Sequence, residues 1–275
     1  MKYFLFALAL LFTFNIQSQN DSISAGKRIW NNFKYDGISV IKSVGNAYTQ
    51  PLRWQKKDFI TAGSFIAGTS LLYLSDNEAQ RYFSKQAEDV PVVLKDFGWY
   101  FGSPQNFFMV SAGVYGFGLL TKNEKVRYTG VLILSSAVAS GLFQTITKTA
   151  VGRARPNEGD HNSFKMFSNL PGYHSFPSGH SILSFSMAHA IAKQFNNFWV
   201  KAGIYAVGSI APISRLWENA HWISDVGFGM AISIVITDGI DNFLRKTNRY
   251  EFQEPKQISW RLKMGAGTIG VVGTF

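Results

Sequence analysis

Residues 214–225 read Ser-Arg-Leu-Trp-Glu-Asn-Ala-His-Trp-Ile-Ser-Asp, which places a histidine four residues before an aspartate. That spacing puts both side chains on one face of a helix, so His221 has an orienting carboxylate available in Asp225. Two earlier stretches add cations and a Ser-Gly turn: residues 148–156, Lys-Thr-Ala-Val-Gly-Arg-Ala-Arg-Pro, and residues 177–180, Pro-Ser-Gly-His. Arginine forks and helix N-termini both bind phosphate well. Together the three stretches supply the groups of a phosphoryl-transfer site with a histidine nucleophile.

The same three stretches resemble, at every defined position, the signature of the type 2 phosphatidic acid phosphatase (PAP2) superfamily, which is K-x6-RP, PSGH and SR-x5-H-x3-D. PSGH alone recurs by chance, whereas three motifs in the right order with matching internal spacing form a specific signal. The superfamily includes lipid phosphate phosphatases, bacterial non-specific acid phosphatases and vanadium haloperoxidases. The resemblance spans about residues 58–240. It implies an all-α bundle of about six helices with the active site at one end.

The resemblance also implies a role for each matched side chain. His221 would attack phosphorus and form a phosphohistidine, and Asp225 would hold its imidazole in the productive tautomer. His180 would protonate the leaving oxygen and then activate water. The phosphoryl oxygens would be bound by Lys148, Arg155, Ser178, Gly179 and Arg215. No metal ion and no other cofactor is expected.

Four further side chains lie near the motifs without matching a defined position. Arg153 is one of them, so its replacement by lysine is expected to be mild. His161 and His174 lie in the loop before the second motif, where they either shape substrate access or have no role. His189 is expected to be structural.

The composition indicates a single domain with much buried or lipid-facing surface. The 275 residues contain no linker rich in Gly, Ser or Pro, and 46% are apolar whereas only 16% are charged; about a quarter is usual for charged residues. Cysteine is absent, which excludes disulfides and cysteine-ligated metals. The net charge of +10 suits anionic partners such as phosphate esters or lipid headgroups. Nucleic acid is not expected, because no basic stripe is interleaved with aromatic residues.

The chain is expected to divide into four parts. Residues 1–18 are typical of an export signal, since Lys2 precedes an apolar run over residues 4–14; an uncleaved anchor is the alternative. Residues 19–57 form an N-terminal arm, either loosely ordered or packed on the surface. Residues 58–245 form the PAP2-like phosphatase domain. Residues 246–275 are a C-terminal tail that includes a segment rich in Gly and Val, which could be extended.

Apolar segments predict six helices, at about residues 59–74, 107–120, 128–147, 181–195, 198–213 and 222–240. Asp58 and Asn106 are the expected N-caps of the first two helices, and Ser178 precedes the fourth. The motif residues fall after the third and fifth helices and at the start of the fourth and sixth. All three motifs are therefore expected to meet at one end of the bundle.

The sequence leaves open whether these helices cross a bilayer. Only residues 128–146 form a nearly charge-free run of spanning length, and the mean hydropathy is +0.01. Six spans with cytoplasmic ends would place basic residues near 122–127, 193–201 and 245–249 inside and the motif cations outside. A cleaved signal would invert that arrangement. A membrane-associated protein with a periplasm-facing site and a soluble periplasmic bundle both remain open.

By resemblance, the expected activity is metal-independent hydrolysis of a lipid phosphate or lipid pyrophosphate. Candidate substrates are phosphatidic acid, phosphatidylglycerophosphate, undecaprenyl (polyprenyl) pyrophosphate and a lipid A phosphate. The motifs contact only the phosphate, so they do not choose among these. A soluble non-specific acid phosphatase would share every site residue, and a vanadium haloperoxidase would share the anion-binding residues. A non-enzymatic envelope protein is the third alternative.

Overall fold

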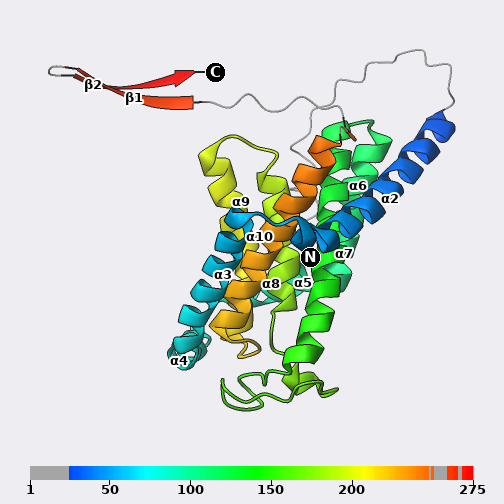
Figure 1. Ribbon diagram of the computed structural model, residues 1–275. Coiled ribbons are helices and arrows are strands. Elements are labelled where there is room, and N and C mark those ends of the chain that lie inside the picture. Colours follow the sequence, from blue (N-terminus) through cyan, green and yellow to red (C-terminus); the bar gives the residue numbers. More distant parts are fainter. Residues whose placement is uncertain (1–24, 248, 251–258, 266–267, 275) are drawn as a thin grey trace.

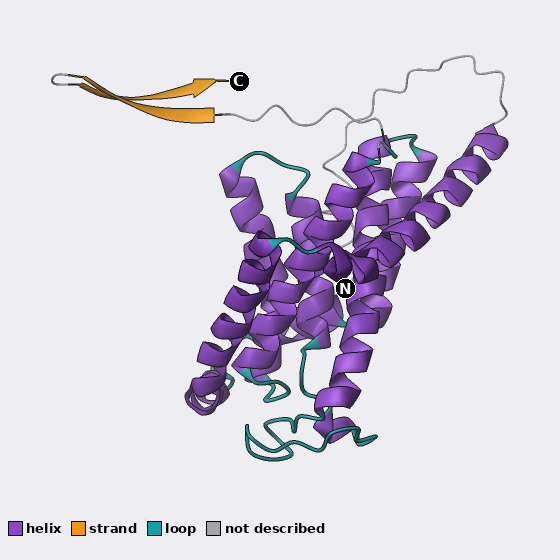
Figure 2. Cartoon of the chain, in the orientation of Figure 1, coloured by secondary structure: helices purple, strands orange, loops and turns teal. Residues whose placement is uncertain are grey.

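The computed structural model describes residues 25–247, 249–250, 259–265 and 268–274. They form an elongated bundle of helices (Figure 1) that is helical almost throughout in Figure 2. The helices are α2 (Ala25–Thr49), η1 (Gln50–Arg53), α3 (Lys56–Leu74), α4 (Asp76–Gln86), α5 (Val92–Gly102), α6 (Pro104–Leu120), α7 (Glu124–Val151), η2 (Pro171–Tyr173), α8 (Gly179–Ala192), α9 (Phe198–Trp217) and α10 (Ile223–Lys246). The expected export signal over residues 1–18 lies outside the described residues.

All six predicted helices are present, as α3, α6, α7, α8, α9 and α10, with ends within six residues of those expected. Three further helices, α2, α4 and α5, were not predicted. Helix α2 packs against α7 and α10, and the Tyr48 hydroxyl donates a hydrogen bond to the Ala139 carbonyl at 2.7 Å. Residues 25–49 are therefore a packed helix, and the loosely ordered alternative is wrong for them. The polar composition of this segment concealed a helix that buries only one face.

Two of the expected N-caps are wrong. Gln55 is the N-cap of α3, and Asp58 lies three residues further on, where its carboxylate accepts a hydrogen bond from the Gln55 amide at 2.8 Å. Helix α6 begins earlier than expected, because Pro104 occupies its first position after the N-cap Ser103. A proline is well suited to that position, where its missing N–H would have no partner in the helix. Ser178 is the N-cap of α8, as expected.

The bundle is organised around α7, which is also the longest helix among the described residues. The helix starts at an N-cap, Asn123, whose side chain accepts a hydrogen bond from the Val126 amide at 3.1 Å. It ends at Gly152, which has φ +59°, and a Cβ there would lie 1.8 Å from the Lys165 carbonyl oxygen. Only glycine fits this left-handed and crowded position. The turn brings the following loop back across the end of the helix.

The apolar core lies where α7 packs against α6, α8 and α10. Its fully buried members include Phe107, Tyr128, Leu132, Ile133, Met187, Ile240 and Leu244. Large apolar side chains also lie on the outside of the bundle, among them Leu71, Leu74, Met109 and Leu142. Exposed apolar residues in such number are unusual for a water-soluble surface and typical of one that meets lipid.

Two described helices are long and apolar enough to cross a membrane, α7 and α10. Their most apolar windows are 56% and 44% buried within the bundle, respectively. Length and composition alone do not separate a spanning helix from a core helix.

The C-terminal tail contains the two described strands, β1 (Ser259–Gly265) and β2 (Thr268–Thr274). They pair antiparallel, with Ser259 opposite Thr274, and form a hairpin outside the helical bundle (Figure 1). The expected extended segment is thus present, while the bundle that carries the motifs is all-α.

Candidate active site

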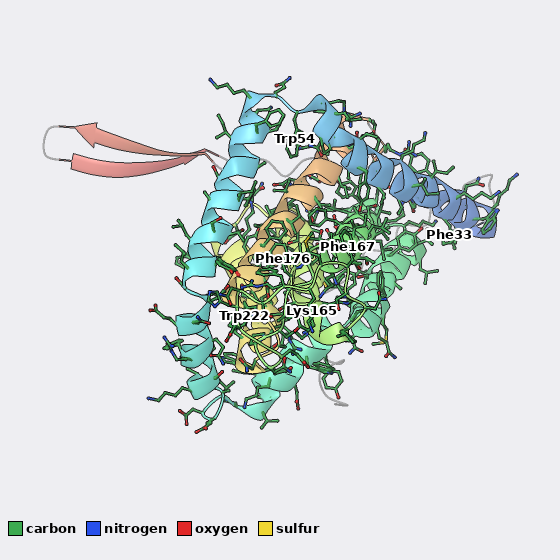
Figure 3. All side chains as sticks on the ribbon, turned by 60° about the horizontal axis from the view of Figure 1, so that its bottom comes forward. Phe33, Trp54, Lys165, Phe167, Phe176 and Trp222 are labelled. Carbon is green, nitrogen blue, oxygen red and sulfur yellow. The ribbon has the colours of Figure 1, made fainter. Side chains whose placement is uncertain are left out.

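Backbone contacts join the three motifs at one end of the bundle. The Ser178 amide donates to the Asp225 carbonyl at 3.1 Å, the Ser175 amide to the Arg153 carbonyl at 3.0 Å, and the Trp222 indole to the Ala154 carbonyl at 2.8 Å. Figure 3 looks at this end, where Trp222, Lys165, Phe167 and Phe176 lie close together. The loop between α7 and α8 lies across this end of the bundle and is held by hydrogen bonds to the first motif, such as Ala154 to Ser163.

Two of the predicted phosphate-binding cations share one acceptor. The His174 carbonyl accepts hydrogen bonds from Lys148 Nζ at 2.6 Å and from Arg155 Nη2 at 3.5 Å. Arg155 is also fixed by the Ala220 carbonyl, 2.9 Å from its Nη1. Within the described part of the chain, neither cation has a carboxylate within 4.0 Å. Two close cations without a paired carboxylate are suited to binding an anion.

His221 lies between Arg155 and Asp225. Its Nε2 is 3.5 Å from Arg155 Nη1, and its Nδ1 is 3.8 Å from Asp225 Oδ2. The second distance is within reach of an ion pair but too long for a hydrogen bond, and the buried Nδ1 has no hydrogen-bond partner among the described residues. Catalytic hydrogen bonds often shorten only when substrate binds. The geometry leaves Nε2 directed towards the cations and Nδ1 towards the carboxylate.

Asp225 is held from several sides by a buried polar network. Its Oδ2 accepts hydrogen bonds from the Ser175 hydroxyl at 2.5 Å and the Trp222 amide at 2.9 Å, and its Oδ1 accepts one from Arg153 Nη1 at 2.6 Å. Arg153 in turn pairs with Asp76 at 2.5 Å. Both carboxylates are fully buried, and Arg153 is 2% exposed. Arg153 therefore fixes the carboxylate that faces the histidine.

Sequence analysis missed this second carboxylate and underestimated Arg153. Asp76 opens α4 and also accepts two hydrogen bonds from Ser224, at 3.0 Å from its amide and 2.7 Å from its hydroxyl. An unpaired buried carboxylate is costly, so Asp76 needs these partners. The sequence offers little signal for the pair, because Asp76 lies 77 residues before Arg153 in the chain.

The second motif forms the N-terminus of α8 beside the first and third. Ser178 is buried and Gly179 is partly buried, and the Ser178 hydroxyl accepts a hydrogen bond from Ser181 at 2.9 Å. A Cβ on Gly179 would lie 2.7 Å from the Gln144 amide nitrogen, so glycine lets α8 start close to α7. The N-terminus of a helix presents free N–H groups and a positive dipole end to an anion.

The unpredicted helix α5 forms a wall of the site. A Cβ on Gly98 would lie 2.4 Å from the Ser214 side chain, and one on Gly102 would lie 2.6 Å from the His180 ring. The Trp99 ring lies 5.6 Å from the His180 ring and 5.0 Å from the Arg215 guanidinium. The Gly98-x3-Gly102 spacing is typical of helices that pack closely. This spacing is the sequence feature from which α5 could have been predicted.

Arg215 is brought to the site but already carries a partner. Its Nη2 pairs with Glu218 Oε1 at 2.6 Å, and its guanidinium lies over Trp99. A phosphate dianion in the site would share this arginine with Glu218. The planar guanidinium can bind both at once, since its five N–H donors point in different directions.

The two histidines are held neutral in the free site. Burial lowers the pKa of His221 to about 4; Asp225 opposes this shift, and the charges of Lys148 and Arg155 add to it. Burial and the neighbouring Arg215 lower the pKa of His180 to about 3. A neutral imidazole is the nucleophilic form. A bound phosphate dianion would oppose the cations and raise the pKa of His180, which would favour the protonated form that a general acid requires.

Several motif residues occupy slightly different places from those expected. Lys148 lies in the last turn of α7 and Arg215 in the last turn of α9, while His221 precedes α10 by two residues. Both loop histidines contribute through their carbonyls: His174 binds Lys148, and His161 binds Arg153 Nε at 3.1 Å. His189 lies on α8 away from the motifs, hydrogen-bonded to Tyr205 at 2.7 Å.

Comparison with known proteins agrees with this geometry. The model of the PAP2 superfamily matches residues 129–247. A lipid A 1-phosphatase of Rhizobium etli is 31% identical over 198 residues, which cover 66% of this chain and 81% of that protein. The chain belongs to the PAP2 superfamily.

Other relatives are of the same kind. A lipid A 1-phosphatase of Rhizobium johnstonii is 30% identical over 192 residues, covering 66% of this chain and 77% of that protein. The crystal structure of a transmembrane PAP2-type phosphatidylglycerolphosphate phosphatase from Bacillus subtilis superposes with a TM-score of 0.49 at 19% identity, covering 68% of this chain and 98% of that chain. The PAP2 member described here is a phosphoric monoester hydrolase.

Proposed function

We propose that this enzyme removes a phosphate from a lipid A-type glycolipid at the periplasmic side of the membrane, through a phosphohistidine on His221. The observation that carries the proposal is the pair of cations at the His174 carbonyl, Lys148 and Arg155, which have no carboxylate within 4.0 Å among the described residues; Arg155 lies beside His221 Nε2. The two relatives compared above are named lipid A 1-phosphatases, which favours this glycolipid over the other lipid phosphates.

The positions of the side chains support the following chemistry. His221 Nε2 attacks phosphorus, the bond from phosphorus to the sugar oxygen breaks, and His180 gives its proton to that oxygen. Water then attacks the phosphohistidine after losing a proton to His180, and inorganic phosphate leaves. The cations and the N-terminus of α8 stabilise the charge that develops on the phosphoryl oxygens.

The substrate can be tested with the purified full-length protein in detergent. We expect inorganic phosphate to be released from bis-phosphorylated lipid A faster than from phosphatidic acid, phosphatidylglycerophosphate or undecaprenyl pyrophosphate. The release should persist in EDTA, because Lys148 and Arg155 supply the positive charge that a metal would bring, and orthovanadate should inhibit it. Equal turnover of all lipids and of p-nitrophenyl phosphate would instead favour a non-specific acid phosphatase.

The charge distribution supports a periplasm-facing site. The site lies at the C-terminal end of α7 and the N-terminal end of α10, and the opposite ends carry Arg127, Lys193 and Arg245. Basic residues near membrane-spanning helices favour the cytoplasmic side. The opposite end of the bundle is therefore the proposed cytoplasmic end.

The absence of cysteine gives a direct test of orientation. Asn169, in the loop beside the site, and Thr121, at the opposite end, are both exposed. In spheroplasts, a membrane-impermeant maleimide should label Asn169→Cys, and it should label Thr121→Cys only after lysis. The reverse pattern would place the site in the cytoplasm.

A further inference from the structure

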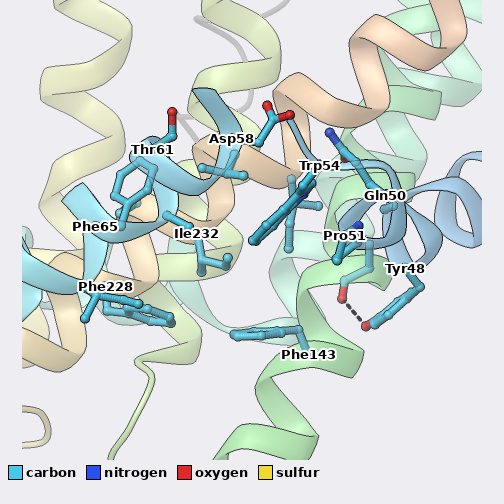
Figure 4. Close-up of a pocket in the computed structure, with 17 residues that line it drawn as sticks. Tyr48, Gln50, Pro51, Trp54, Asp58, Thr61, Phe65, Phe143, Phe228 and Ile232 are labelled. Carbon is cyan, nitrogen blue, oxygen red and sulfur yellow. Dashed lines mark hydrogen bonds between the residues drawn. The ribbon is translucent and has the colours of Figure 1, made fainter. Parts of the chain in front are cut away.

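An apolar cavity of about 390 Å³ lies between α3, α7 and α10 and is closed at one end by η1 (Figure 4). Its lining is almost wholly apolar, and the rings of Trp54, Phe65, Phe143 and Phe228 face the same space. Its size falls in the range of cavities that hold small ligands, about 300–1,000 Å³. None of the motif residues lines it, so the proposed chemistry gives it no role.

The cavity begins next to the active site. Phe228 lies on α10, three residues after Asp225, and its ring is 4.7 Å from that of Phe176. Phe176 is two residues before Ser178, the N-cap of α8. On the other side Phe143, one residue before the Gln144 that contacts Gly179, stacks on Phe228 with 6.2 Å between the ring centroids. The rings of Phe176 and Phe228 thus lie between the cavity and the N-terminus of α8, where the phosphate is proposed to bind.

The cavity runs away from the site along the bundle. Its lining on α10 extends from Phe228 to Ile236, which is about 12 Å along a helix axis. Helix α3 and the preceding η1 run antiparallel beside α10, since Leu72 of α3 lies next to Gly227 at the site end and Gln50 of η1 lies next to Gly239 at the far end. Helix α3 also carries apolar side chains on its outer surface, such as Ile66, which is 64% exposed at the edge of the cavity.

We infer that this cavity binds a hydrocarbon chain of the lipid whose phosphate enters the site, and that it sets the enzyme's preference for acyl-chain length. The inference rests on the proposed function for the identity of the lipid, but the cavity itself can be tested separately. A chain attached near the phosphate would pass Phe176 and Phe228 and extend towards Trp54. Its methylenes would then lose contact with water against an apolar lining, which is favourable.

The first test measures occupancy without turnover. Trp54 is the tryptophan that lines the cavity, and bromine atoms on an acyl chain quench a tryptophan that they touch. With His221→Ala, which should not hydrolyse the probe, glucosamine 1-phosphate carrying two brominated tetradecanoyl chains should quench the tryptophan fluorescence more than it does with His221→Ala/Trp54→Phe. Equal quenching in the two proteins would overturn the inference. Quenching that appears only after removal of residues 1–18 would assign the cavity to that segment and would also overturn it.

The second test measures chain-length preference with a matched pair of variants. Ala62 on α3 lines the cavity, whereas Ala67 on the same helix is exposed and does not. Ala62→Phe should raise KM for the tetradecanoyl substrate about tenfold, the cost of losing roughly two buried methylenes. The KM of Ala62→Phe for glucosamine 1-phosphate with hexanoyl chains, and for p-nitrophenyl phosphate, should stay close to the wild-type value. Ala67→Phe should have wild-type KM values for all three substrates.

The outcomes separate the two proposals. Trp54-dependent quenching without phosphate release from the lipid by the wild-type protein would leave the cavity assignment standing and contradict the proposed function. Phosphate release with the same chain-length preference in Ala62→Phe and wild type would support the proposed function and contradict the cavity assignment.

Discussion

His221→Ala is expected to lose activity on every substrate, whereas His180→Ala is expected to lose it selectively. Without the His221 imidazole there is no nucleophile to accept the phosphoryl group, whatever the leaving group. His180 protonates the departing oxygen, which matters for a sugar or alkyl oxygen and little for nitrophenolate. General acid catalysis is worth roughly a hundred- to ten-thousandfold where it is needed. Hydrolysis rates on lipid A and on p-nitrophenyl phosphate measure this difference directly.

The His180→Ala variant should also trap the intermediate. With p-nitrophenyl phosphate it should give a burst of nitrophenol and then slow, because water attack lacks its base. An acid-labile, alkali-stable phosphoprotein should accumulate. His189→Ala is the matched control, since His189 lies away from the motifs and is bonded to Tyr205 and Asp238; it should show neither effect. A burst and trapped phosphate in His221→Ala, with neither in His180→Ala, would reverse the two roles.

The three motifs were sufficient to predict that residues 148–156, 177–180 and 214–225 meet at one end of the bundle. Their spacing is a local property of the sequence, and the apolar segments between them gave all six predicted helices. The fold then brings the ends of those segments together: the Ser178 amide donates to the Asp225 carbonyl, and the Trp222 indole donates to the Ala154 carbonyl. The position of the motif residues at one end of the bundle does not by itself identify the substrate or assign a role to each residue.

The helices that were missed are not long apolar segments, and the six helices were predicted from such segments. Helix α4 is short and polar, and helix α2 buries a single face that includes Asp36, Ser39 and Ser43. Helix α5 spans only 11 residues and contains two glycines, which are poor helix formers. Those glycines are required by packing against Ser214 and His180, a contact that no local propensity reveals.

Arg153 shows a second limit of sequence analysis. Arg153 and Arg155 lie two residues apart, and the motif defines only the second as a phosphate ligand. In the structure Arg155 faces His221, whereas Arg153 is buried between Asp76 and Asp225. The expectation that Arg153→Lys is mild does not fit these contacts, because one ammonium cannot replace a guanidinium that reaches two carboxylates and the His161 carbonyl.

The two arginines should therefore fail in different ways when each is changed to lysine. Arg155→Lys should lower kcat about a hundredfold, the usual cost of one lost transition-state hydrogen bond, with an unchanged thermal unfolding midpoint. Arg153→Lys should lower both kcat and the midpoint. The midpoint falls because breaking a buried ion pair costs on the order of 3–5 kcal/mol. The kcat falls because Asp225 loses its contact with Arg153 and is no longer held in a fixed orientation towards His221.

Asp76→Asn separates positioning from simple destabilisation. It removes the buried charge that Arg153 balances but leaves the Arg153–Asp225 pair in place. We expect a lower unfolding midpoint with the acid limb of the kcat/KM profile unchanged, whereas Arg153→Lys should shift that limb because the contact between Asp225 and His221 changes. Equal midpoints and equal kcat losses in Arg153→Lys and Arg155→Lys would show that both arginines bind phosphate. In that case Asp225 must be held by Ser175 and the Trp222 amide alone.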